Sequence, residues 1–114
     1  MSQVQAKVAD VKQGSRKIIL TGKITRISAT REIQTRFGPA RVATATVEDE
    51  TGSIYLNLWR TQIDLVKEGD FVRIENAFAN SFRGDLELNM GSDGKIVVLS
   101  REGPQSNVDQ LTGS

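Results

Sequence analysis

Hydrophobic and polar residues alternate with a period of two along much of this chain, which is typical of strands with one buried face. The clearest case is Ser53–Trp59 (SIYLNLW), where Ile54, Leu56 and Leu58 fall on one face. Other segments share this alternation or are rich in β-branched residues: Lys17–Ile27, Arg41–Val47, Phe71–Ile74, Leu86–Met90 and Lys95–Leu99. The pattern predicts an all-β protein with five or six short strands.

Turn signals and one short helical segment separate the predicted strands. Glu48–Gly52 (EDETG) and Gly91–Gly94 (GSDG) are typical of turns. Ser28–Gly38 (SATREIQTRFG) is polar and basic, and we expect it to form the first long loop. We expect Asn76–Gly84 (NAFANSFRG) to be a loop or an irregular strand end. Thr61–Gly69 (TQIDLVKEG), after the third strand, begins with a capping threonine and ends with glycine, which predicts one or two helical turns.

Together these elements predict one small, closed or nearly closed β-barrel. Gly22 lies inside a strand, where glycine often marks a bend at the corner of a barrel. A chain of 114 residues has room for one domain, which we assign to residues 8–99. We expect residues 1–7 to be a flexible N-terminus and residues 100–114, which have no periodicity, to be a disordered tail.

The composition excludes several kinds of chemistry. The sequence contains no histidine and no cysteine, so the commonest general base and the thiolate and imidazole metal ligands are missing. No glycine-rich phosphate loop, nucleophile elbow or acid–base pair is recognisable. We therefore expect no enzymatic activity and no cofactor. No apolar run approaches the ~20 residues of a membrane-spanning helix, and residues 1–10 have no signal-peptide core, so we expect a cytoplasmic protein without membrane contact.

The aromatic residues are the best candidates for a binding surface. Trp59 lies on the strand face opposite the apolar row, so it points outward if that row faces the barrel interior. Alternatively, Trp59 folds over a barrel mouth as a lid on the core. Tyr55 shares the face of Trp59 and either extends a stacking row or packs as an ordinary cross-strand aromatic. Phe37 beside a Gly-Pro turn is expected to pack within its loop, with clamping of a ligand as the alternative, and Phe71 at a strand start is expected in the core.

Two further phenylalanines, Phe78 and Phe82, follow the predicted strand Phe71–Ile74. Phe82 lies in a polar segment just before glycine, a setting that suits a surface residue better than a core residue. Counting in twos from Val72 and Ile74 places Phe78 on the inward face, so spacing alone favours a core position. Phe78 faces outward only if the strand contains a bulge at Asn76 or the next residue.

Basic residues lie close to these aromatics, although the net charge is only +1, from fifteen basic and fourteen acidic residues. Bulk charge therefore does not identify a nucleic-acid-binding protein, and the basic residues would have to lie on one face. Cations that interleave with exposed aromatics suit single-stranded nucleic acid, because bases stack on the rings while cations follow the phosphates. The candidate phosphate or base-edge contacts are Arg36, Arg41, Arg60, Arg73 and Arg83.

Six short motifs occur along the chain in a characteristic order. They are Val8–Gly14 (VADVKQG), Glu48–Ser53 (EDETGS), Leu56–Trp59 (LNLW), Glu68–Asp70 (EGD), Ile74–Phe78 (IENAF) and Phe82–Asn89 (FRGDLELN). Each is weak alone, but their order and spacing resemble the archaeal single-stranded DNA-binding proteins with one OB domain, which are related to the OB domains of replication protein A. The resemblance covers roughly residues 8–99. It implies an OB-fold: a five- to six-stranded Greek-key β-barrel with one short helix between strands 3 and 4.

The resemblance also implies a function and a set of binding residues. Bases would stack on Trp59, Phe78 and Phe82, which for Phe78 overrides the count in twos and implies a bulge near Asn76. The implied function is sequence-tolerant binding that protects single-stranded DNA in replication, recombination and repair, by a monomer associated with the nucleoid. The alternatives are an RNA-binding OB domain or an OB subunit of a larger assembly like replication protein A. Relatives often recruit replication or repair proteins through a long tail, and residues 100–114 are short by comparison.

Overall fold

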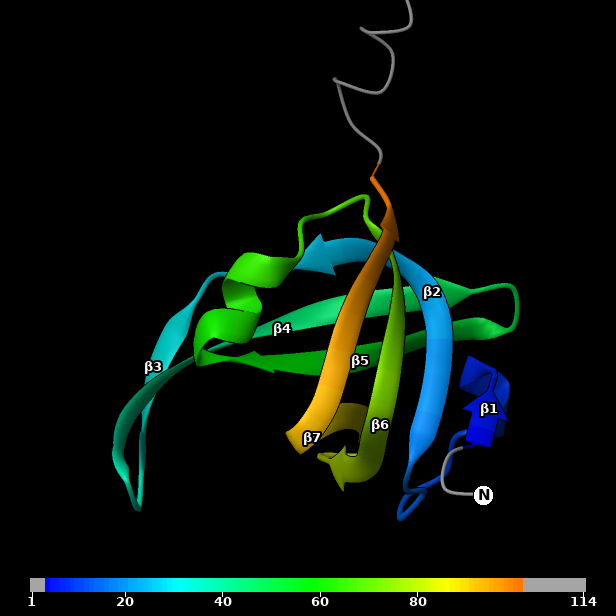
Figure 1. Cartoon of the computed structure of the whole chain (residues 1–114). Helices are drawn as coiled ribbons and strands as arrows, with labels where there is room; N and C mark the ends of the chain where they lie inside the picture. The colour runs from blue at the N-terminus through cyan, green and yellow to red at the C-terminus, as the bar shows by residue number, and fades with distance from the viewer. Residues whose placement is uncertain (1–3, 102–114) are drawn as a thin grey trace, which may run out of the picture.

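Seven strands account for most of the part of the chain that the computed structural model describes, residues 4–101 (Figure 1). They are β1 (Val4–Ala6), β2 (Ile18–Ile27), β3 (Arg31–Thr35), β4 (Gly38–Asp49), β5 (Gly52–Trp59), β6 (Phe71–Phe82) and β7 (Asp85–Ser100). Two short 3-10 helices, η1 (Val8–Asp10) and η2 (Arg60–Leu65), lie before β2 and between β5 and β6. None of the helices in this range is long and apolar enough to cross a membrane.

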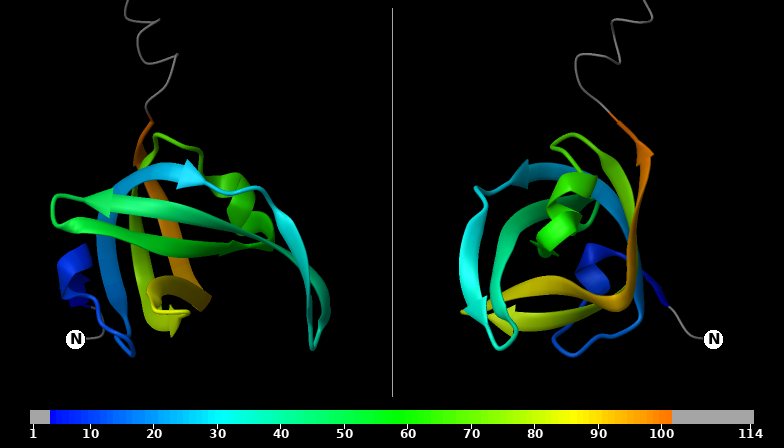
Figure 2. Two further views of the ribbon diagram at one scale, coloured as in Figure 1. Left: turned by 180° about the vertical axis from the view of Figure 1, so that it is seen from behind. Right: turned by 60° about the vertical axis from the view of Figure 1, so that its left-hand side comes forward.

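Five of the strands close into a ring. The sheet order is β1-β2-β6-β7-β5-β4-β3, and an additional pairing of β2 with β4 joins its two sides. Within the ring only β5 and β7 run parallel, while the other neighbouring strands are antiparallel. Figure 2 shows the closed ring most clearly in its right-hand view. The closed β-barrel predicted from the sequence is confirmed.

The bend predicted at Gly22 is the point where β2 passes from one partner strand to the other. Gly22 pairs with Val72 of β6, and the next residues of β2 pair with β4. A Cβ atom at Gly22 would lie only 2.7 Å from the carbonyl oxygen of Glu48 and 2.8 Å from Cγ1 of Val47. Only glycine therefore lets the two strands approach this closely at the corner of the barrel.

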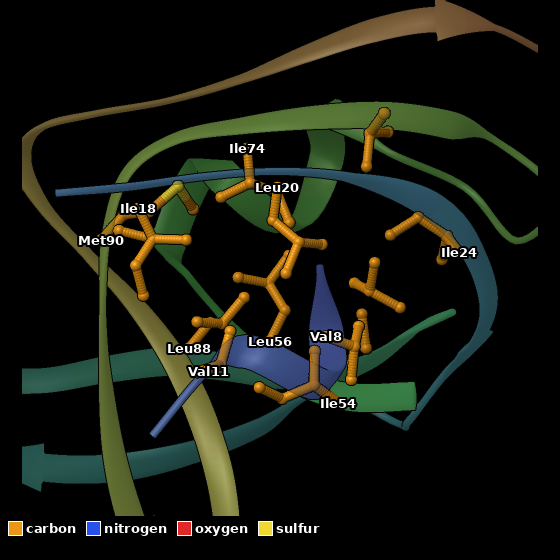
Figure 3. Packing of buried hydrophobic residues seen from close by; sticks show 14 of the residues in the cluster. Val8, Val11, Ile18, Leu20, Ile24, Ile54, Leu56, Ile74, Leu88 and Met90 are labelled. Atoms are coloured by element: carbon orange, nitrogen blue, oxygen red, sulfur yellow. The ribbon is translucent and has the colours of Figure 1, made fainter. Parts of the chain in front are cut away.

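Apolar side chains from the inward-facing rows fill the barrel. Along β2 every second residue from Ile18 to Ile24 is buried. Along β5 the predicted inward row of Ile54, Leu56 and Leu58 is buried, and Asn57 on the opposite face is also covered. Figure 3 shows part of this packing, with labelled side chains from η1, β2, β5, β6 and β7, and the cluster also includes Ala45 and Val47 of β4. The largest fully buried apolar side chains of this cluster are Leu20, Ile24, Leu56, Leu58, Ile74, Leu88, Val47 and Val72. Burial of each such side chain stabilises the barrel by about 1.5–3 kcal/mol.

Two strands lie outside the ring, where the sequence predicted irregular structure. β3 lies in the segment expected to be the first long loop, and it forms a hairpin with β4 that extends away from the ring (Figure 2). β1 pairs in parallel with β2 within residues 1–7, which were expected to be a flexible N-terminus. β3 has no buried residue. A strand held by backbone pairing alone has no hydrophobic alternation by which the sequence could predict it.

Three further segments differ in detail from the prediction. The helical turns expected over Thr61–Gly69 are the 3-10 helix η2, which begins and ends earlier. Asn76–Gly84 is mostly strand, because β6 continues to its junction with the tight turn at Arg83 and Gly84, whose φ angles are 54° and 87°. Gly91–Gly94 does not reverse the chain, because β7 runs through it. Most of the expected disordered tail, residues 102–114, lies outside the described residues.

Candidate nucleic-acid interface

The outward face of β4, β5 and the first half of β7 forms a continuous surface. Tyr55, Asn57 and Trp59 of β5 face outward, since Ile54, Leu56 and Leu58 are buried in the core. Across β4 the three outward residues pair with Thr46, Thr44 and Val42 respectively, and Tyr55 pairs with Glu87 of β7. This register places the outward residues of β4, β5 and β7 side by side on one surface.

Trp59 ends β5 and lies between two hollows of this surface. Its side chain is half-buried and lines one hollow with Phe82 and another with Phe37. Its backbone N–H donates to Oε1 of Gln62 at 2.9 Å, which holds the start of η2 against the end of β5. Trp59 is not part of the buried core cluster, so the alternative of a lid on the core does not apply.

The bulge predicted near Asn76 is present and reverses the phase of β6. The pairing of β6 with β7 shifts between Glu75 and Ala77, and Asn76 has a φ angle of 57°, in the left-handed region. Ala77 is consequently buried, while Phe78 faces outward with 37% of its surface exposed. On β7 the residues between Met90 and Lys95 lie opposite this single bulged residue.

Phe82 lies at the end of β6, where the hairpin to β7 turns. It is 56% exposed and pairs with Asp85 across the tight turn. The guanidinium carbon of Arg83 lies 5.1 Å from the centroid of the Phe82 ring, within the range of a cation–π interaction. The ring also lines the groove that contains Trp59. Tyr55, 40% exposed, lies in a neighbouring hollow beside Gly84 and Asp85.

A groove of about 230 Å³ brings Trp59 and Phe82 together. This volume is below that of most drug-sized pockets and suits a single flat ring. The lining residues are Arg31, Ile33, Val42, Asn57, Trp59, Phe82 and Glu87. Ile33 was not among the candidates, although it is a lone apolar residue in a polar segment and is 38% exposed.

A polar network crosses the floor of this surface from β3 to β7. Asn57 is buried, with only 8% of its surface exposed. Its Oδ1 accepts a hydrogen bond from Oγ1 of Thr44 at 3.1 Å. Its amide nitrogen donates to Oε1 of Glu87 at 2.8 Å and to Oδ1 of Asn89 at 3.3 Å. Nε1 of Trp59 reaches the same oxygen of Asn89 at 3.5 Å. The network satisfies a buried amide and connects the indole of Trp59 to the sheet.

The predicted arginines do not all reach the groove. Arg60 lines the second hollow with Phe37 and Trp59. Arg73 pairs with Glu75 at 2.8 Å in the half of β6 before the bulge, and Arg41 lies 4.0 Å from Asp64. The basic residue that does line the groove is Arg31, whose Nη2 lies 3.5 Å from Oγ1 of Thr44.

Two expectations for aromatic residues need correction. Phe37, expected to pack within its loop, lies at the tip of the β3–β4 hairpin and is 84% exposed. Arg36 beside it is also exposed. Phe71, expected in the core, is 41% exposed because it directly precedes the buried Val72 and therefore lies on the outward face of β6.

This five-stranded ring, with its exposed β4–β5 face flanked by the β3–β4 hairpin and the β6–β7 turn, has the architecture of an OB-fold, whose corresponding face and loops bind oligonucleotides and oligosaccharides. Residues 4–98 match the family model "Single-stranded DNA binding protein Ssb-like, OB fold". The chain belongs to this family of OB-fold single-stranded DNA-binding proteins, which confirms the resemblance predicted from the motifs.

Individual relatives agree with this assignment. The chain is 37% identical over 105 residues to the single-stranded DNA binding protein Ssb of Saccharolobus solfataricus, an alignment that covers 91% of this chain and 71% of the relative. It is 29% identical over 93 residues to replication factor A of Methanothermobacter thermautotrophicus, covering 81% of this chain and 12% of the relative. Among solved structures, the OB domain of Ta0387 from Thermoplasma acidophilum matches with a TM-score of 0.74 and 28% identity, covering 88% of this chain and 91% of that domain.

Proposed function

We propose that this protein binds single-stranded DNA with little sequence preference by stacking bases on Trp59, Phe78 and Phe82. The observation that carries the proposal is the groove in which Trp59 and Phe82 lie together, with Phe78 exposed on the same half of β6. Stacking on one aromatic ring contributes about 1–3 kcal/mol per base and depends little on base identity, because every base has a π-face. A duplex would bind weakly, since its bases are already stacked and paired.

Cations around the stacking surface would contact the phosphates. Arg31 in the groove, Arg60 in the second hollow and Arg83 above Phe82 lie beside the aromatic rings. Arg41 and Arg73 each lie beside a carboxylate, at 4.0 and 2.8 Å respectively, so we expect a smaller contribution from them. A single OB domain of this kind covers on the order of 4–5 nucleotides.

A fluorescence titration tests this function directly, because Trp59 is the only tryptophan of the chain. Addition of a single-stranded thymidine oligomer should quench its emission, because a stacked base contacts the indole. A matched RNA strand and a DNA duplex are titrated in parallel, and the duplex should bind much more weakly. Unchanged fluorescence together with no gel shift for any single strand would refute the proposal.

The cellular role follows from this activity. We propose that the protein acts as a monomer on exposed DNA at the nucleoid of the cytoplasm, during replication, recombination and repair. The similarity to a replication factor A supports a role in DNA metabolism. Replication or repair proteins would be its partners. Equal affinity for the RNA strand in the same titration would favour an RNA-binding OB domain instead.

A further inference from the structure

The carboxylate of Glu87 lies in the middle of a surface proposed to bind a polyanion. Its side chain lines the same groove as Trp59 and Phe82. Oε1 accepts a hydrogen bond from the amide of Asn57 at 2.8 Å. Within residues 4–101 no ion pair involves Glu87, so a neutral amide rather than a cation holds the carboxylate in place.

A charged acceptor at this position has two consequences for a bound strand. Its negative charge opposes the approach of phosphates, which lowers affinity. Its second oxygen, Oε2, has no hydrogen-bond donor among the described residues and remains available to a ligand. A ligand group that donates a hydrogen bond would therefore satisfy Oε2, and a group that only accepts would be repelled.

The edges of the pyrimidine bases differ in this respect. Cytosine carries an amino donor at its 4-position, whereas thymine and uracil carry a carbonyl acceptor at the same place. In a single strand this edge is not paired, so it is free to contact protein. A base that stacks in the groove between Trp59 and Phe82 would direct an edge toward its lining, which includes Glu87.

We propose that Glu87 is a specificity-determining residue that accepts a hydrogen bond from the exocyclic amino group of a base stacked in this groove. The inference rests on the proposed function and adds a preference to it: cytosine over uracil or thymine. One hydrogen bond to a charged group is compatible with broad binding, and it predicts a preference of about tenfold or more.

The test compares oligomers of deoxycytidine and deoxyuridine of equal length, which share a backbone and lack a 5-methyl group. Affinities are measured with the full chain by anisotropy of labelled oligomers at slightly alkaline pH. We expect the deoxycytidine oligomer to bind about tenfold more tightly. Equal binding of both oligomers within twofold would overturn the role of Glu87 and leave the proposed function intact, whereas no binding of either would refute the proposed function itself.

Two variants separate base contact from simple repulsion. In Glu87→Gln the side chain keeps its shape but loses its charge, and its amide can also donate to a carbonyl, so the preference should fall to within about twofold. Glu32→Gln removes the same charge from an exposed site on β3 outside the groove and should leave the preference unchanged. If Glu87→Gln instead tightens both oligomers equally, Glu87 acts only by repulsion and the proposal is wrong. The comparison of the two oligomers on the unmodified protein stands even if a variant fails to fold.

Discussion

Replacement of Asn57 by alanine tests whether the polar network holds the proposed interface together. The buried amide makes three hydrogen bonds to neighbouring side chains, to Thr44, Glu87 and Asn89. A neutral hydrogen bond contributes about 0.5–1.5 kcal/mol net, and one to a charged group about 1.5–3 kcal/mol. The lower end of the sum of these three bonds is about 2.5 kcal/mol. Because Thr44 and Glu87 are partly exposed and regain water in the variant, we expect a loss slightly below this value, about 2 kcal/mol.

The loss is measured by urea denaturation followed by circular dichroism. A decrease of about 2 kcal/mol in the free energy of unfolding corresponds to a fall of about 10 °C in Tm for a domain of this size. Asn80→Ala is the matched control, since Asn80 is exposed on β6, the neighbour of β7, where it pairs with Glu87. It carries the same change of residue type and should alter stability by less than about 0.5 kcal/mol. If the two variants are equally stable, the network contributes nothing and the reasoning is refuted.

Two other substitutions test the barrel rather than its surface. Gly22→Ala should lower the free energy of unfolding by about 1–3 kcal/mol, because its Cβ would lie 2.7 Å from a backbone oxygen; unchanged stability in urea denaturation would show that the corner can relax. Burial raises the pKa of Asp49, but hydrogen bonds from Thr51 and from the backbone N–H of Val8, with the charge of Lys7, outweigh it and lower the pKa below its usual value. The stabilisation from Asp49 is therefore fully present above the unfolded pKa of about 3.9 and is lost as the pH falls through the lower folded pKa. Asp49→Asn should reduce stability at neutral pH, and its difference from the unmodified protein should shrink in acid; a pH-independent difference in urea midpoints would contradict this.

The sequence predicted the parts of the fold that bury one face. Alternation along β5 identified its inward row and allowed an outward position for Trp59, because burial imposes a period of two. β3 has no buried face, so its polar sequence could not be distinguished from a loop. Phe71 and Phe37 were misplaced, since an apolar residue type does not reveal whether local pairing leaves it exposed.

The candidate site depended on contacts that are distant in sequence. Counting in twos wrongly placed Phe78 in the core, because one bulged residue reverses the phase of β6. Only the family resemblance indicated this bulge. The hydrogen bond between Asn57 and Glu87 forms because β5 and β7 are parallel neighbours in the sheet. The two residues are thirty positions apart in the sequence, so no local pattern predicts this contact. The roles of Trp59 and Phe82 in binding stay predictions, although their shared groove brings them together.

The most direct test of the central claim, that bases stack on this face, is an alanine series with Trp59 as the reporter. Phe78→Ala and Phe82→Ala are compared with Phe71→Ala, which removes an equally exposed phenyl ring from the far end of β6. Titration with one thymidine oligomer should show affinity losses of about 5- to 150-fold for the first two variants, corresponding to about 1–3 kcal/mol per stacked base. Phe71→Ala should bind within about twofold of the unmodified protein, as expected for a surface substitution outside the site. Equal affinities for all three variants would contradict the stacking account.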